Sequence, residues 1–180
     1  TDTLFSQQEI FPNIRAWNAE TPNTYTLVVS TFDAQGKPLE SFTHLFGFRT
    51  VEMCNGMQMI NGKAVLFKGV NRHEHDPHKG RTISVASMIH DIQLMKQFNL
   101  NGVRNCHYPN YSAWYELCTE FGLYMVNEAN IESHGMMDHK DGTLANYPDW
   151  ERPFMERMSR MIARDRNYSA IVTWSMGNES

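Results

Sequence analysis

The chain has 180 residues, of which 41% are hydrophobic and 20% charged, and its formal net charge is -4. These proportions are ordinary for a globular protein. The absence of a basic run argues against nucleic-acid binding, and no apolar stretch reaches the roughly 20 residues that a membrane helix needs. The three cysteines are sparse and form no C-x-x-C motif, which indicates neither a disulfide scaffold nor a zinc ribbon. We therefore expect a cytoplasmic protein with no nucleic-acid or membrane partner.

Residues 1–62 have the pattern of a β-domain. Apolar and β-branched runs predict strands at 25–29, 42–51 and 57–60. Asn55-Gly56 and Asn61-Gly62 are typical of tight hairpin turns. Three strands are too few to close a sandwich, so we expect this region to be the C-terminal end of a β-sandwich domain.

Residues 63–180 alternate between strand and helix patterns. The predicted strands are 65–70, 101–105, 123–126 and 170–174. The predicted helices begin near Ser84, at Ser112 as a plausible N-cap, and at Asp149 as a cap. This alternation implies parallel strands joined by crossover helices, either half of a (β/α)₈ barrel or a small doubly wound sheet. No glycine-rich loop follows the first strand, which disfavours a dinucleotide fold.

Polar and ionisable residues follow all four predicted strands. They are Asn71, Arg72, His73, Glu74 and His75; Arg104, Asn105, Cys106, His107 and Tyr108; Asn127, Glu128, Asn130, Glu132 and His134; and Asn178 and Glu179. In a (β/α)₈ barrel the carboxyl ends of the strands converge on one face, where active sites lie. The sequence therefore predicts one site built from four strand ends.

Carboxylates facing one another suit acid and nucleophile chemistry on a sugar acetal, and Glu132-x-His134 also suits a metal ion. A thiol nucleophile is a weak alternative. Side-chain alternation in an extended segment would direct Cys106 away from the face used by Asn105 and His107.

Four sequence blocks carry a family resemblance. They are Asn71-Arg72-His73-Glu74-His75, Arg104-x-x-His107-Tyr108-Pro109-Asn110, residues 127–135 (NEANIESHG) and residues 174–180 (WSMGNES). In order and spacing they resemble family 2 glycoside hydrolases of the bacterial β-galactosidase type. Gly47-Phe48-Arg49 and residues 60–63 resemble the exit from that family's immunoglobulin-like domain into its barrel.

The resemblance implies a mixed fold in two parts. Residues 1–62 would be the C-terminal part of an immunoglobulin-like β-sandwich, and residues 63–180 the N-terminal half of a TIM-barrel catalytic domain. The implied activity is retaining hydrolysis of terminal β-D-galactose from β-D-galactosides such as lactose. The parent enzyme would be a homo-oligomer.

The resemblance also implies the roles of individual residues. Glu179 would be the catalytic acid/base, and Asn178 would bind the sugar 2-hydroxyl. His73 and His107 would contact the sugar. Glu132, His134 and Glu179 would bind Mg²⁺, for which Mn²⁺ could substitute, and a Na⁺ ion would have ligands largely outside these residues. The family's nucleophile is a glutamate on a later strand, so the 180 residues alone should be inactive.

Other functions stay open at this point. β-Glucuronidase and β-mannosidase are alternatives within the family. A barrel hydrolase with His73, His75 and Glu179 as zinc ligands belongs to a different class. A third possibility is a non-catalytic fragment that complements the rest of the enzyme.

Overall fold

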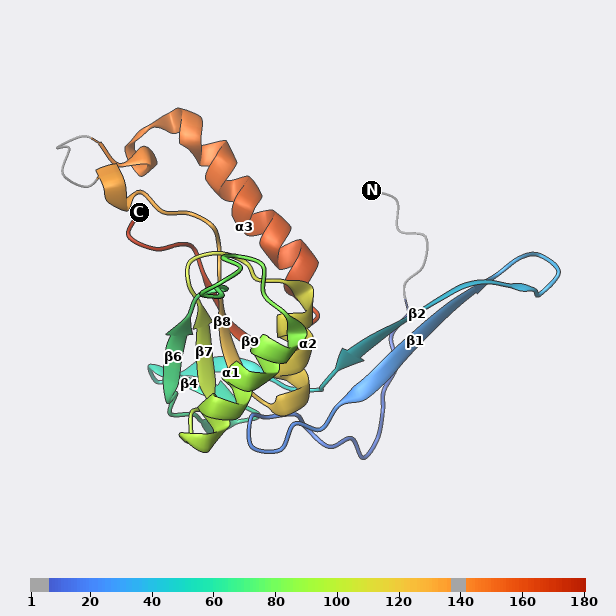
Figure 1. Ribbon diagram of the computed structural model, residues 1–180. Helices are drawn as coiled ribbons and strands as arrows, with labels where there is room; N and C mark the ends of the chain where they lie inside the picture. Colours follow the sequence, from blue (N-terminus) through green and yellow to red (C-terminus); the bar gives the residue numbers. More distant parts are fainter. Residues whose placement is uncertain (1–6, 137–141) are drawn as a thin grey trace.

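A computed structural model describes residues 7–136 and 142–180 (Figure 1). The strands form three separate sheets. The first two sheets are antiparallel: β1 (Tyr25–Phe32) with β2 (Pro38–Phe46), and β3 (Val51–Cys54), β4 (Met57–Ile60) with β5 (Lys63–Ala64). The third is parallel: β6 (Gly69–Arg72), β7 (Gly102–Asn105), β8 (Tyr124–Glu128) and β9 (Ile171–Ser175).

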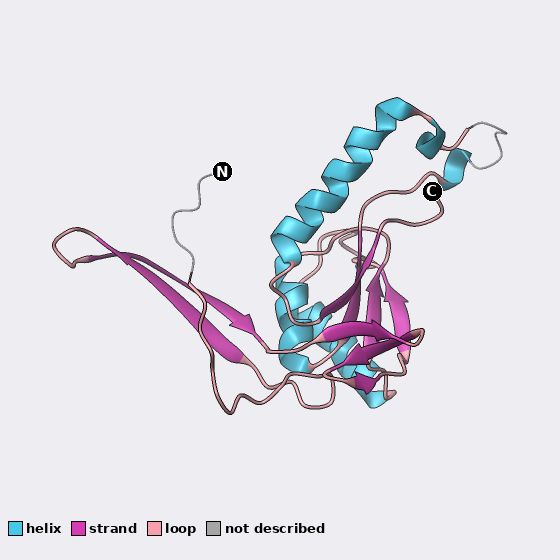
Figure 2. Cartoon of the chain, turned by 180° about the vertical axis from the view of Figure 1, so that it is seen from behind, coloured by secondary structure: helices cyan, strands magenta, loops and turns pink. Residues whose placement is uncertain are grey.

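The parallel sheet has the order β6-β7-β8-β9, so each strand lies beside its neighbour in sequence. The crossovers are α1 (Val85–Gln97), α2 (Ser112–Phe121) and α3 (Glu151–Asp165). Helices α1 and α2 cover one face of the sheet (Figures 1 and 2). This arrangement confirms the predicted parallel strands and is part of a (β/α)₈ barrel, with the helices on the outside.

The helix starts agree with the sequence only in part. Ser84 caps α1 as expected, because its hydroxyl accepts a hydrogen bond from the Ser87 amide at 3.2 Å. The N-cap of α2 is Tyr111, not Ser112, and Glu74 accepts the Tyr111 amide hydrogen at 3.1 Å. Trp150 precedes α3, and Asp149 lies in the short 3₁₀ helix η3 (Pro148–Trp150). A carboxylate from another strand end thus replaces the local cap that the sequence suggested for α2.

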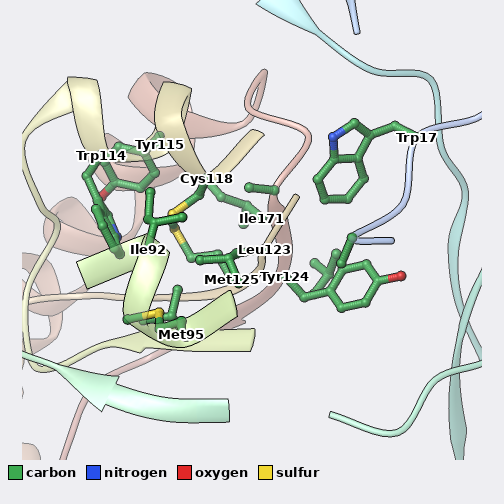
Figure 3. Close-up of a cluster of buried hydrophobic side chains, with 14 of the residues drawn as sticks. Trp17, Ile92, Met95, Trp114, Tyr115, Cys118, Leu123, Tyr124, Met125 and Ile171 are labelled. Atoms are coloured by element: carbon green, nitrogen blue, oxygen red, sulfur yellow. The ribbon is translucent and has the colours of Figure 1, made fainter. Parts of the chain in front are cut away.

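The core lies between the sheet and helices α1 and α2 (Figure 3). Fully buried side chains come from both helices and from the strands: Ile92, Trp114, Tyr115, Cys118 and Met125. Burial of an aliphatic side chain such as Ile92 or Met125 contributes about 1.5–3 kcal/mol. Trp17, far away in sequence, packs edge-on against Tyr124 and donates from Nε1 to the Thr119 carbonyl at 2.8 Å. The segment before β1 is therefore anchored to the barrel part.

The predicted strand 42–51 is two strands, β2 and β3, separated by residues 47–50. Gly47 explains the break, because a Cβ at this position would lie 2.4 Å from Cβ of Trp17. The chain therefore turns around the buried indole instead of continuing straight. Beyond this point β1 and β2 project from the rest of the chain as a long hairpin (Figure 1). The first predicted strand of the barrel also differs, since pairing begins at Gly69 and not at residue 65.

Among the residues that the structure describes, no helix combines the length and apolar character that crossing a bilayer requires.

Candidate active site

The carboxylate of Glu128, at the end of β8, is the centre of the strand-end site. Its side chain is fully buried. Arg104 on β7 binds it through two hydrogen bonds, from Nε at 2.7 Å and from Nη2 at 3.0 Å. Ser175, the last residue of β9, donates from Oγ at 2.8 Å. Three adjacent strands thus converge on one carboxylate, as strand ends of a barrel should.

His107 also binds Glu128, with Nδ1 2.7 Å from Oε1. Burial raises the pKa of Glu128, but the hydrogen bonds from Arg104, His107 and Ser175 outweigh burial and hold the pKa below its ordinary value. Glu128 is therefore ionised at neutral pH and can only accept hydrogen bonds.

The contact with Glu128 determines which nitrogen of a neutral His107 ring carries the hydrogen. Because Glu128 is an acceptor, Nδ1 must carry the hydrogen, and the neutral ring then has its lone pair on Nε2. The Arg104 Nη2 atom, 3.3 Å from Nδ1, cannot donate to a nitrogen that already holds a proton. Nε2 has no hydrogen-bond partner among the described residues, so it is free to accept one from a ligand.

The outward-facing strand residues do not belong to the site. Asn105 accepts from Trp114 Nε1 at 2.9 Å and donates to Asn127 at 3.2 Å, and Asn127 donates to Asp165 at 2.8 Å. All of these groups lie under the helices. Alternation along the strands is the cause, since Arg104 and Glu128 occupy the opposite face. Grouping Asn105 and Asn127 with the strand-end site was wrong.

The expected orientation of Cys106 was also wrong. Strand β7 ends at Asn105, so alternation does not extend to the next residues. The Cys106 thiol is buried and lies near the rings of His73 and His107, whose centroids are 5.2 Å apart. Burial raises the pKa of this thiol, and the Arg104 charge opposes that effect.

Glu132, His134 and Glu179 form a second, exposed cluster whose ligand atoms lie within 4.8 Å of one another. His134 Nδ1 contacts Glu179 Oε2 directly. Backbone pairing holds the cluster: Glu132 and Asn178 form a parallel bridge, and the Ser133 amide donates to the Glu179 carbonyl at 3.3 Å. Two carboxylates and one imidazole at a solvent-exposed place fit a hexacoordinate divalent cation that keeps several waters.

Asn178 joins the two clusters. Its Oδ1 accepts from Arg104 Nη2 at 2.8 Å, and its Nδ2 donates to Glu132 Oε1 at 3.3 Å. The backbone here is unusual, because Glu179 has a φ of 45°. Gly177 lies so close to Ile131 that a Cβ would be 2.5 Å from the Ile131 carbonyl oxygen. Strained backbone of this kind is typical of functional sites.

The predicted residues therefore fall into two neighbouring groups. His73, His107 and Asn178 lie around the Glu128 network, and Glu179 lies with Glu132 and His134. The alternative zinc set of His73, His75 and Glu179 is not among the clusters that the described residues form. Ser175 was missed, and only its place at the end of a strand could have indicated it.

A parallel sheet with crossover helices on one face and polar side chains at its strand ends is the arrangement of part of a (β/α)₈ barrel. Comparison with protein families agrees. Residues 51–180 match "Glycosyl hydrolases family 2, TIM barrel domain", and residues 2–49 match "Glycosyl hydrolases family 2". The chain belongs to glycosyl hydrolase family 2.

Similar proteins include the β-galactosidases of Pseudoalteromonas haloplanktis and Yersinia enterocolitica. Each is 52% identical, over 165 and 164 residues that cover 92% and 91% of this chain. The chain spans only 16% and 15% of their respective lengths. It is thus a fragment when compared with these relatives.

Similar solved structures include two β-glucuronidases. The enzyme from Bifidobacterium dentium, complexed with coumarin-3-O-glucuronide, has a TM-score of 0.81 and 29% identity, covering 92% of this chain and 26% of its own. The enzyme from Ruminococcus gnavus, complexed with D-glucaro 1,5-lactone, has a TM-score of 0.82 and 28% identity, covering 93% and 28%. The barrel fold is therefore shared beyond the galactosidases.

Proposed function

We propose that this chain is a segment of a β-galactosidase that releases terminal β-D-galactose from β-D-galactosides such as lactose, with retention of configuration. The main support is that Glu179 lies beside His134 and Glu132, in two segments joined by a backbone bridge. Asn178 links this cluster to the Glu128 network through its hydrogen bond with Arg104. The identity of about 50% to β-galactosidases over most of the chain supports the galactoside as substrate.

In this proposal Glu179 is the acid/base. It donates a proton to the glycosidic oxygen, and after the leaving group departs it accepts one from the attacking water. Its exposed carboxylate is accessible to both. A retaining enzyme needs a second carboxylate about 5–5.5 Å away as nucleophile. We assign that role to a residue outside the 180, so these residues alone should not turn over substrate.

The sugar would be held by groups whose orientation is already fixed. His107 offers Nε2 as an acceptor because Glu128 occupies Nδ1. Asn178 is oriented by Arg104 and Glu132, and keeps one amide hydrogen and one lone pair for the 2-hydroxyl. His73, exposed and next to His107, would contact the sugar from the adjacent strand end.

Glu132, His134 and Glu179 would hold Mg²⁺, with Mn²⁺ as a substitute. When bound, the cation would supply positive charge that favours the ionised form of Glu179 and fixes its position. Manganese accepts an imidazole more readily than magnesium does, which suits a set that contains His134. A Na⁺ ion is also part of this proposal, with its ligands largely outside these residues.

The rest of the proposal concerns the parent protein. Residues 1–62 would complete an immunoglobulin-like β-sandwich that precedes the barrel half at 63–180. The enzyme would be a cytoplasmic homo-oligomer of carbohydrate metabolism. The hairpin β1–β2 supports the sandwich, since apolar residues on it, including Val28 and Phe42, are more than half exposed and would be covered by missing strands.

β-Glucuronidase is the second candidate, favoured by the solved structures named above. A glucuronide carries a carboxylate that needs a cationic partner. Arg104, the guanidinium within the described strand-end site, is already paired in two hydrogen bonds with Glu128. This pairing and the lower identity, 28–29% against about 50%, favour the galactosidase.

Hydrolysis of nitrophenyl β-galactoside and β-glucuronide by the full-length protein would decide between them. We expect kcat/KM for the galactoside to exceed that for the glucuronide by at least about 100-fold, the discrimination that a site built around specific hydrogen bonds supplies. Equal activity on both sugars, or a preference for the glucuronide, would overturn the proposal.

A further inference from the structure

A second set of metal-ligand side chains lies at the strand ends, apart from Glu132, His134 and Glu179. His73 follows β6, and Cys106 and His107 follow β7. One ligand atom from each lies within 4.8 Å of the other two. The set contains a thiol and two imidazoles and no carboxylate, which gives it a different metal preference from the other cluster.

We propose that His73, Cys106 and His107 bind a borderline or soft divalent cation such as Zn²⁺, as a site separate from the Mg²⁺ cluster. Thiolate and imidazole are preferred zinc ligands, whereas magnesium requires oxygen. Tetrahedral zinc with Zn–S near 2.3 Å and Zn–N near 2.0 Å places its ligand atoms about 3.3–3.6 Å apart. His73 is exposed, so rotation of its ring can close the remaining distance.

The surroundings of His107 are those of a metal ligand. A metal-bound histidine usually donates its other ring nitrogen to a carboxylate, which fixes the ring and makes the ligand nitrogen more basic. Glu128 accepts from Nδ1 at 2.7 Å, and Arg104 and Ser175 hold that carboxylate in turn. The nitrogen left for the cation is Nε2, which lacks a hydrogen-bond partner among the described residues.

Cys106 is held in place by its backbone, because its amide donates to the Arg72 carbonyl at 3.1 Å. Cys106 is 1% exposed, so its thiol is shielded from solvent. His73 is exposed, so a cation can enter the site from the side of His73. On binding, the S–H bond breaks, the proton leaves to solvent, and the thiolate forms the metal bond. Three protein ligands leave a fourth position for water.

This site uses the two imidazoles that we assign to the sugar. If the proposed function holds, Zn²⁺ and the galactoside compete for His73 and His107. Metal binding itself does not depend on the enzyme's substrate, so the two proposals can fail separately.

Co²⁺ is a suitable probe because cobalt–thiolate bonds give a near-ultraviolet charge-transfer band that carboxylate and imidazole ligands do not give. The full-length protein titrated with Co²⁺ should show this band, and Cys106→Ser should abolish it. Cys54→Ser, at an exposed free cysteine, should leave it unchanged. No band in the unmodified protein, or the same band in Cys106→Ser, would overturn the site.

Because Cys106 is buried and its substitution could impair folding, a second variant tests the metal site at the exposed His73. His73→Gln should weaken Co²⁺ binding at least tenfold, judged by the same band, whereas His75→Gln, two residues away and also exposed, should not. Equal affinities for these two variants would rule out His73 as a ligand. In a separate assay Zn²⁺ should raise the apparent KM for a nitrophenyl galactoside in unmodified protein and not in Cys106→Ser. If the protein has no galactosidase activity, the band still reports on the metal site.

Discussion

The two carboxylate groups at the strand ends differ in how their charge is balanced. Glu128 is fully buried and receives hydrogen bonds from Arg104, His107 and Ser175. The Glu179 side chain is 48% exposed, and its one partner within ion-pair distance among the described residues is the His134 imidazole. The first carboxylate has all its charge neutralised by protein, while the second still requires a cation or a proton.

This difference indicates a division of labour. A buried, fully hydrogen-bonded ion is costly to disturb and so keeps its neighbours in one arrangement. An exposed carboxylate with spare acceptor sites can exchange a proton or bind a metal ion. We therefore propose that the Glu128 network is the scaffold and that the Glu179 cluster is the reactive part. Each prediction below changes one of the two groups and names the activity or stability measurement that tests it.

The largest effect is expected at Glu179. In the full-length enzyme Glu179→Gln should lower kcat/KM for a galactoside by about 10²–10⁴-fold, because general acid–base catalysis contributes that much. Stability should change by no more than about 0.5 kcal/mol, as for other exposed positions. Glu120→Gln, an exposed glutamate on α2, is the control and should leave both unchanged. Near-normal activity in Glu179→Gln would remove Glu179 from the reaction.

Glu128→Ala should produce a large loss of stability, which Glu179→Gln should not. Removing one partner of a buried ion pair costs about 3–5 kcal/mol, and we expect the lower end because the Arg104 side chain remains 29% exposed. Denaturant unfolding of the full-length protein should show the loss, with Glu120→Ala as the matched control. A stability change below about 1 kcal/mol would mean that the network is not a scaffold.

The sequence predicted the barrel half well because strand and helix patterns repeat within short windows. It could not assign caps supplied from elsewhere, as where Glu74 accepts the amide of Tyr111. Alternation from Arg104 and Glu128 would have placed Asn105 and Asn127 under the helices. It failed for Cys106 because β7 ends one residue earlier.

The strand-end pattern placed Glu132 and Glu179 at one site, but their direct contact was expected only from the family resemblance. No local pattern spans the segment between them, and the contact depends on backbone pairing of residues 131–133 with residues 178 and 179. Ser175 was missed for a similar reason, since a serine at a strand end has no distinctive signal until its partner, Glu128, is located.

A smaller effect is expected at Glu132, which tests the cation requirement of the exposed cluster. Glu132→Gln should raise the Mg²⁺ concentration needed for half-maximal activity by at least about tenfold, because even indirect changes around a metal cost about 10–100-fold. Asn178 can still donate to the glutamine oxygen, so stability should be unaffected. Chelation should lower activity, and Mg²⁺ or Mn²⁺ should restore it. An unchanged Mg²⁺ requirement in Glu132→Gln would exclude this residue as a ligand.

The smallest effect concerns acid stability and separates the scaffold from the reactive cluster by pH. The folded-state pKa of Glu128 lies below its ordinary value. Its stabilising contribution is therefore fully present above the unfolded pKa, about 4.3, and is lost as the pH falls through the folded pKa. Glu128→Gln removes this titration, so its unfolding free energy should decline less steeply below about pH 4 than that of the unmodified protein.

Glu179→Gln is the internal comparison for this experiment. Because the Glu179 carboxylate is exposed, it contributes little to the folded state, and the pH dependence of unfolding should match that of the unmodified protein. If both variants reduced the decline of the unfolding free energy at low pH equally, the two carboxylates would be equally coupled to folding. The separation of scaffold from reactive group would then fail, because protonation of Glu179 would cost as much folding free energy as protonation of Glu128.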